Sequence, residues 1–223
     1  MGGLIPQAST FAAPIDSLFL VVLIVTGIAF VLVEGILIYF LIRYRHRQGQ
    51  KASYVHGNRR IELAWTVGTG IAFFSLALYQ YNTWTQIKVA LPDRSTAVLV
   101  GVSSSQFDWK ATYPGEDGAL DIADDIKAPI NILHFPVNRP VIIRLDSVDV
   151  IHSFFVPAFR VKQDAVPGRP IEFWFEATQP GQYEAACAEL CGLGHYRMRG
   201  RVTIETQAEF EAWLAEVKAR QGG

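Results

Sequence analysis

The chain has 223 residues, of which 50% are hydrophobic and 12% aromatic, and its formal net charge is −1 at pH 7. This composition fits a small membrane-anchored domain, and a nearly neutral charge gives no support for nucleic-acid binding. The sequence contains no internal repeat and no low-complexity segment, which argues against a repeat architecture.

Two long apolar runs, residues 17–42 and 61–81, come first along the chain. Each contains a single charged residue, Glu34 in the first run and Glu62 in the second. Each run is long enough to cross a bilayer, whose core needs about 20 helical residues. The first run is too long for a cleaved signal peptide and lacks a basic lead-in, so residues 17–81 are expected to form a transmembrane helical hairpin.

The charges beside these runs predict their orientation. No Lys or Arg precedes residue 17, whereas six basic residues and no acidic one lie between the runs: Arg43, Arg45, Arg47, Lys51, Arg59 and Arg60. The positive-inside rule therefore predicts a cytoplasmic loop at residues 43–60, an external N-terminal segment at 1–16 and an external soluble domain at 82–223. Because membrane helices flank it, this basic loop is a poor candidate for binding nucleic acid.

From residue 82 onward, short β-rich segments alternate with turn residues. The predicted strands are residues 96–103, 141–147, 150–156, 171–177, 182–186 and 199–205. This pattern predicts an all-β Greek-key sandwich. A helix is expected over residues 207–220, because Thr206 and Glu209 have the spacing of a capping box and an apolar stripe follows them.

The segment that follows the predicted strand at 182–186 concentrates metal-binding side chains. The only two cysteines, Cys187 and Cys191, precede His195 and Met198, and His152 lies upstream at the end of an apolar run. Thiolate, thioether and imidazole ligands suit copper, whereas carboxylate-rich sites suit hard cations. These side chains exceed the needs of one tetrahedral ion and are enough for two copper ions that share both sulfurs.

Four other interpretations of this segment are weaker. A disulfide would leave His195 and Met198 unexplained and has demanding geometry over so short a span. Zinc sites seldom use methionine, and a blue-copper site needs only one cysteine. A copper-delivery protein with a Cys-x-x-x-Cys pair is the best chemical competitor, but such pairs usually lie early in an alternating β/α pattern.

The pattern Cys187-x-Glu189-x-Cys191-x-x-x-His195-x-x-Met198, preceded by His152, resembles the copper A motif of cytochrome c oxidase subunit II. The family pattern also agrees with two flanking segments, residues 150–157 and 164–169, and with the order of membrane segments and soluble domain along the chain. The resemblance therefore covers nearly the whole chain. It implies a cupredoxin-like fold and two copper ions held by these six residues, with Glu189 binding through its backbone carbonyl. The related quinol-oxidase subunits lack the copper ligands, which disfavours that membership.

The resemblance also implies a function and partners. The domain would accept electrons from cytochrome c, or from a cytochrome c domain, and pass them to heme in catalytic subunit I of a proton-pumping oxidase, with subunit III as a further partner. It would lie on the periplasmic side of a bacterial cytoplasmic membrane and catalyse nothing alone. A membrane-anchored copper-delivery or thiol redox protein is the alternative, and it would bind one copper loosely.

Two carboxylates outside the copper ligand set acquire roles from the resemblance. The side chain of Glu189 is expected to reach a magnesium ion shared with the catalytic subunit. Glu62 is expected to lie at the entrance of a proton channel, although an interfacial glutamate near a helix N-terminus is also favoured by the helix dipole. The resemblance assigns no role to Glu34, for which a helix or subunit contact is expected.

The electron donor is expected to meet the domain near Phe107, Trp109 and Asp149. Phe107 occupies the position at which mitochondrial-type relatives carry an electron-entry tryptophan, which makes the chain more similar to bacterial oxidases with a dedicated donor. Phe107 and Trp109 can equally be core aromatics. No Cys-x-x-Cys-His sequence is present, so the chain carries no attached cytochrome c of its own. Asp149, three residues before His152, is the best-placed acid for a basic donor.

Overall fold

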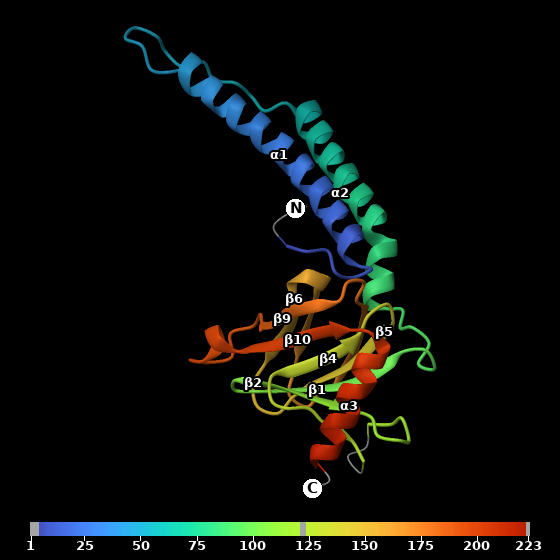
Figure 1. The fold of residues 1–223 in the computed structure, drawn as a ribbon. Helices are drawn as coiled ribbons and strands as arrows, with labels where there is room; N and C mark the ends of the chain where they lie inside the picture. Colours follow the sequence, from blue (N-terminus) through green and yellow to red (C-terminus); the bar gives the residue numbers. More distant parts are fainter. Residues whose placement is uncertain (1–4, 121–123, 222–223) are drawn as a thin grey trace. The chain divides into compact units, whose positions relative to one another are not determined.

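The computed structural model describes residues 5–120 and 124–221, and it divides into two compact units. One unit is helical and covers residues 16–83. The other begins at residue 84 and also includes the N-terminal segment up to residue 15. Figure 1 shows the order of the elements along the chain.

The helical unit contains most of α1 (Ala12–Arg43) and α2 (Arg59–Lys88). At 1.5 Å per residue these helices are about 48 and 45 Å long, more than the roughly 30 Å of a bilayer core. Their apolar side chains are mostly exposed, as expected for surfaces that meet lipid or another subunit. The side-chain oxygen of Asn58 accepts hydrogen bonds from the amides of Arg60 at 3.0 Å and Ile61 at 3.4 Å, which caps the start of α2.

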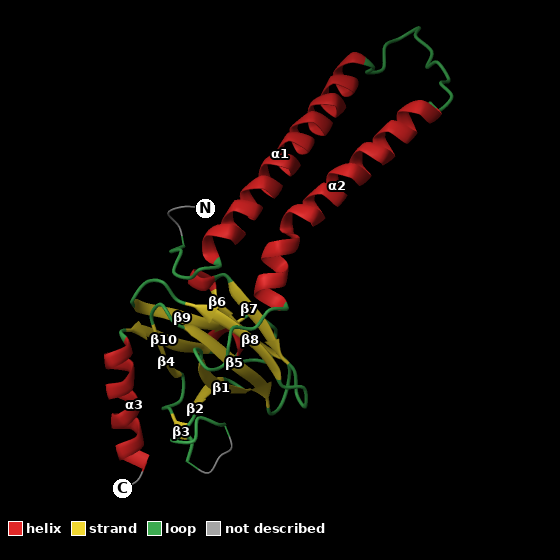
Figure 2. Cartoon of the chain, turned by 90° about the vertical axis from the view of Figure 1, so that its right-hand side faces the viewer, coloured by secondary structure: helices red, strands yellow, loops and turns green. Residues whose placement is uncertain are grey.

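The second unit is a β-sandwich of two sheets, coloured yellow in Figure 2. The first sheet has the order β3-β2-β1-β5-β8, and the second has the order β4-β10-β9-β6-β7. Pairs β1–β5 and β4–β10 are parallel, and the other pairs are antiparallel. The strands are β1 (Val98–Ser105), β2 (Asp108–Tyr113), β3 (Ile126–Lys127), β4 (Ile132–Pro136), β5 (Pro140–Ser147), β6 (His152–Val156), β7 (Val161–Ala165), β8 (Ile171–Glu176), β9 (Gly181–Cys187) and β10 (Arg199–Glu205).

Aromatic side chains fill the space between the two sheets. Trp109 meets Phe154 edge-to-face with ring centroids 5.3 Å apart, and Phe135 meets Phe175 in the same way at 5.2 Å. All four side chains are fully buried. Successive side chains along a strand point alternately into this core and toward solvent, and this alternation is the pattern from which strands are predicted in the sequence. The predicted architecture of two apolar helices followed by a cupredoxin-like sandwich is confirmed.

The closing helix α3 (Gln207–Gln221) packs against the sandwich. The capping box is confirmed, because the Glu209 carboxylate accepts hydrogen bonds from the Thr206 hydroxyl at 2.7 Å and from its amide at 2.9 Å. Trp213 stacks on His134 with ring centroids 4.0 Å apart. The apolar stripe of α3 therefore serves packing.

Residues 5–12 form a strap across the sandwich. The amide of Ala8 donates to the carbonyl of Ala158 at 2.9 Å, and the Ser9 hydroxyl donates to the carbonyl of Phe159 at 2.7 Å. Phe11 is 6% exposed and meets Trp174 edge-to-face at 4.6 Å. The chain segment before α1 thus contributes to the core of the domain that follows α2.

Candidate metal centre

The ends of neighbouring strands bring the predicted copper ligands together. His152 begins β6 and Cys187 ends β9, and these strands pair with Phe154 opposite Cys187. Cys191 lies in the loop that follows β9, His195 begins the short 3-10 helix η2 (His195–Arg197), and Met198 directly precedes β10. The sheet therefore fixes both ends of the loop that carries most of the ligand set.

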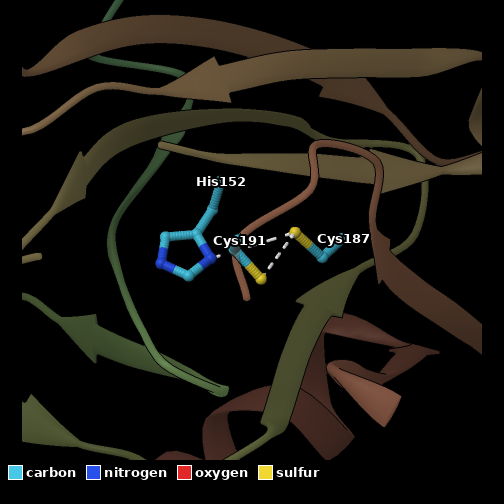
Figure 3. Close-up of side chains that lie close together, drawn as sticks. All are labelled: His152, Cys187 and Cys191. Atoms are coloured by element: carbon cyan, nitrogen blue, oxygen red, sulfur yellow. Dashed lines mark hydrogen bonds between the residues drawn. The ribbon is translucent and has the colours of Figure 1, made fainter. Parts of the chain in front are cut away.

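The two sulfurs lie at the centre of the cluster, each beside one imidazole. The Sγ atoms of Cys187 and Cys191 are 3.9 Å apart. The Sγ of Cys187 is 3.9 Å from Nδ1 of His152, and the Sγ of Cys191 is 3.7 Å from Nδ1 of His195. Figure 3 shows the side chains of His152, Cys187 and Cys191 close together. The carbonyl oxygen of Glu189 lies 3.2 Å from the Cys187 sulfur, and the Sδ of Met198 lies 3.8 Å from the Cys191 sulfur. All six predicted donors are thus within reach of the thiol pair.

The chemistry of this donor set fits copper. Both cysteines are free and buried, so the disulfide interpretation does not describe this structure. Burial and then the adjacent Cys187 thiol raise the pKa of Cys191 to about 11. Two buried thiolates in contact repel each other unless a cation binds them, and metal binding releases the protons of ligating thiols. A soft cation is therefore the natural occupant of these sulfurs.

Asp149 orients the imidazole of His152. Its Oδ1 is 2.8 Å from Nε2 of His152, the nitrogen opposite the one that faces the Cys187 sulfur. The carboxylate also accepts hydrogen bonds from the amides of Gln106 at 2.7 Å and Val150 at 2.6 Å. Partial burial opposes ionisation of this carboxyl, but the hydrogen bond from His152 and those from the two amides outweigh it and lower its pKa. This contact is of the kind that fixes the tautomer of a metal-binding histidine.

Phe107 packs on the loop that carries Cys191. Its half-buried ring lies so close to Gly194 that a side chain at Gly194 would collide with it, and the guanidinium of Arg197 lies 5.9 Å from the ring centroid. The neighbouring Gln106 side chain donates to the carbonyl of Cys191 at 2.5 Å. The structure thus brings Phe107 to the ligand cluster, on the surface side of the loop.

Trp109 instead lies inside the sandwich. It is fully buried, and its ring centroid is 6.2 Å from that of His152. Its indole nitrogen has no hydrogen-bond partner among the residues that the structure describes. Trp109 is therefore a core aromatic that packs beside His152, one of the predicted ligands.

A chain of charges outside the cluster holds the Glu189 side chain. Its carboxylate is 3.2 Å from the ammonium of Lys162, which is also 3.1 Å from Asp164. A hydrogen bond from Ser153 and the Lys162 charge lower the pKa of Asp164 against the effect of burial. The side chain of Glu189 is thus half-exposed and paired with an ammonium group, while its carbonyl faces the Cys187 sulfur.

Glu62 and Glu34 belong to the helical unit. Glu62 lies in the first turn of α2, next to the Asn58 cap, and its side chain is exposed. Glu34 is half-buried in the middle of α1. The position of Glu62 agrees both with the entrance of a proton channel and with an ordinary interfacial glutamate, and no contact among the described residues distinguishes these interpretations.

Family models match most of the chain. The model described as "Cytochrome C oxidase subunit II, transmembrane domain" matches residues 2–83. The model described as "Cytochrome C oxidase subunit II, periplasmic domain" matches residues 120–206, which include every predicted copper ligand. The helices α1 and α2 therefore cross the bacterial cytoplasmic membrane, and the sandwich lies on its periplasmic side.

Relatives and a solved structure agree with these matches. The "Alternative cytochrome c oxidase subunit 2" of Bradyrhizobium diazoefficiens is 32% identical over 219 residues, which cover 89% of this chain and 78% of the relative. Cytochrome c oxidase subunit 2 of Synechocystis is 30% identical over 260 residues, covering 96% and 75%. The periplasmic domain of cytochrome oxidase subunit II of Bradyrhizobium japonicum superposes with a TM-score of 0.50 at 29% identity, covering 59% of this chain and 98% of that one. The chain belongs to the cytochrome c oxidase subunit II family, whose members are copper-binding subunits of a heme-copper oxidoreductase complex.

Proposed function

We propose that this domain holds two copper ions and is the electron-entry site of a proton-pumping heme-copper oxidase. The proposed ligands are His152, Cys187, the carbonyl of Glu189, Cys191, His195 and Met198. The observation that carries the proposal is the grouping of the other four donor atoms around the two free, buried thiols, which are 3.9 Å apart. Each sulfur has its own imidazole neighbour, which is the arrangement that a pair of ions sharing both thiols requires.

The protein residues have separable tasks in this function. When bound, the copper pair supplies a centre that accepts and releases single electrons. The sandwich keeps Cys187 and Met198 away from water, since they are only 8% and 1% exposed. The Asp149 carboxylate holds the ring of His152 so that Nδ1 faces the thiol. Ligands held by packing and by outer hydrogen bonds move little, which favours fast electron transfer.

The remaining roles follow from family membership and are part of the proposal. The donor is cytochrome c or a cytochrome c domain, and the acceptor is heme in catalytic subunit I, with subunit III in the same complex. Glu62 marks the entrance of a proton channel. The Glu189 side chain binds magnesium with the catalytic subunit, a role in which it exchanges its Lys162 partner for the ion.

Copper content and spectroscopy test the metal assignment. We expect the full chain, purified and loaded with copper, to hold two copper ions and to be purple. Cys191→Ser removes a thiol that both ions need and should abolish the dinuclear electron resonance spectrum. Met198→Leu removes only a weak thioether ligand, so it should keep both ions and shift the reduction potential. A single, easily removed copper ion in the wild-type protein would favour the copper-delivery alternative instead.

A further inference from the structure

A cavity of about 590 Å³ lies against the outer face of the sheet that contains β1, β5 and β8, beside α3. It shares no residue with the copper ligand cluster. Its size falls in the range of small-molecule pockets. Its character comes from an apolar floor and a rim of cationic side chains. The six residues that define these parts are Leu99, Ile142, Leu214, Arg94, Arg139 and Arg144.

The floor is formed by the outward side of the sheet. Val141 and Ile143 point into the core between the sheets, so Ile142 points to the opposite face. Ile142 is nevertheless only 1% exposed, and it lies directly opposite Leu99 in the β1–β5 register. Leu214 of α3 adds a third apolar wall. Leu99 and Leu214 are only partly buried, so they offer apolar surface to a ligand, while the buried Ile142 backs them.

Among the described residues, the rim of the cavity has three arginines but only one carboxylate, that of Glu172. Glu172 lies opposite Arg144 in the β5–β8 register, yet its carboxylate pairs with Arg94 at 2.5 Å. The side chain of Arg144 consequently makes no hydrogen bond or ion pair with any residue that the structure describes. Arg139 uses its Nε to donate to the carbonyl of Thr96 at 3.0 Å, and within the described part of the chain its terminal nitrogens have no partner. Two guanidinium groups thus line one cavity, and neither pairs with a carboxylate of residues 5–120 or 124–221.

We propose that this cavity binds a small amphipathic anion, with a carboxylate or phosphate head held by Arg139 and Arg144 and an apolar body against Leu99 and Leu214. Guanidinium groups bind both kinds of head through paired hydrogen bonds, which a point charge does not reproduce. Glu172 pairs with Arg94, so the anionic head of the ligand would be the negative partner of Arg139 and Arg144. The apolar body of the ligand would cover the apolar floor of the cavity. The cavity therefore distinguishes an amphipathic anion both from a bare anion and from a neutral aromatic.

Titration calorimetry on the full, copper-loaded chain in nanodiscs of zwitterionic lipid tests this proposal. The probe is 1-naphthyl phosphate, compared with inorganic phosphate and with neutral 1-naphthol after subtraction of binding to empty nanodiscs. We expect saturable binding of one naphthyl phosphate and at least tenfold weaker binding of the other two. Arg144→Gln and Arg139→Gln should each weaken the probe about tenfold, because each removes a charge-assisted contact.

Arg201→Gln is the matched control, because Arg201 is an exposed arginine on β10, in the other sheet, and does not line the cavity. The Arg201→Gln variant should bind 1-naphthyl phosphate with the affinity of the wild type. Absence of saturable binding, equal weakening by the control, or equal binding of inorganic phosphate would each overturn the proposal. Anionic phosphatidylglycerol added to the nanodisc identifies the source: suppression of probe binding indicates a lipid headgroup, and unchanged binding indicates a soluble anion.

Discussion

Replacing Asp149 by asparagine should weaken copper binding rather than merely alter a surface charge. The carboxylate uses Oδ1 for Nε2 of His152 and for the amide of Val150, and Oδ2 for the amide of Gln106. Asparagine keeps one acceptor oxygen and places an NH2 group against either the histidine side or the Gln106 amide. Either the Gln106 amide alone, or both His152 and the Val150 amide, therefore lose their acceptor, and the ionic character of the remaining bonds disappears.

The size of the effect follows from the number of bonds lost. A hydrogen bond to a charged group is worth about 1.5–3 kcal/mol. Loss of an outer partner of a ligating histidine typically weakens metal binding about 10–100-fold, which corresponds to about 1.4–2.8 kcal/mol. These two figures agree, so Asp149→Asn should release copper to a chelator at a concentration about 10–100-fold lower than the wild type requires.

The assay is chelator competition followed by the absorbance of the copper centre. Asp146→Asn is the control, because the Asp146 carboxylate accepts a hydrogen bond from the amide of Ser147 at 2.7 Å and, among the described residues, bonds to none of the predicted copper ligands. Equal copper retention in wild type and Asp149→Asn would refute the positioning role of Asp149. A selective loss of the bimolecular rate with a basic cytochrome c at low salt, with copper binding intact, would favour donor docking instead.

Three further outcomes are expected. Phe11→Ala should destabilise the periplasmic domain by about 3 kcal/mol in denaturant unfolding, because it empties a buried site beside Trp174; unchanged unfolding would show that the strap is not part of the cooperative core. Glu62→Gln should slow turnover of the assembled oxidase while copper content and copper reduction stay normal, and full turnover would support the interfacial-glutamate interpretation. Hydrogen bonds from Thr206 lower the pKa of Glu209 below that of an ordinary glutamate, so the stabilising effect of its carboxylate is present above the ordinary pKa and is lost as the pH falls through the lowered one. Glu209→Gln should therefore flatten the acid dependence of the melting temperature, and an unaltered pH profile would contradict this.

The sequence indicates a candidate metal cluster because the predicted ligands are chemically distinctive and closely spaced. Cys187, Cys191, His195 and Met198 lie within twelve residues, so their proximity hardly depends on the fold. His152 is separated from them by most of the second sheet, and only the family motif associates it with them. The β6–β9 pairing supplies the physical reason for that association.

Other elements were missed for identifiable reasons. Residues 108–113 alternate buried and exposed side chains as β2, but the segment was interpreted as an aromatic stretch near the donor site, and Trp109 faces the core. Strand β7 is rich in polar residues and lies at a sheet edge, where hydrophobic alternation is weak. The contacts of Asp149 and Lys162 depend on rotamers and loop ends, which no local pattern encodes.

The strap has a consequence for biogenesis. The Ser9 hydroxyl donates a hydrogen bond to the carbonyl of Phe159, 150 positions later in the chain, so the domain cannot close until residues that precede α1 meet residues that follow α2. Contacts of such high sequence separation fold slowly, because loop-closure entropy is lost before they form. Because the strap packs on the periplasmic sandwich, residues 5–12 must themselves reach the periplasmic side of the membrane. A chain in which they stay on the other side would leave the sandwich without part of its core, however well the strands that follow α2 had formed.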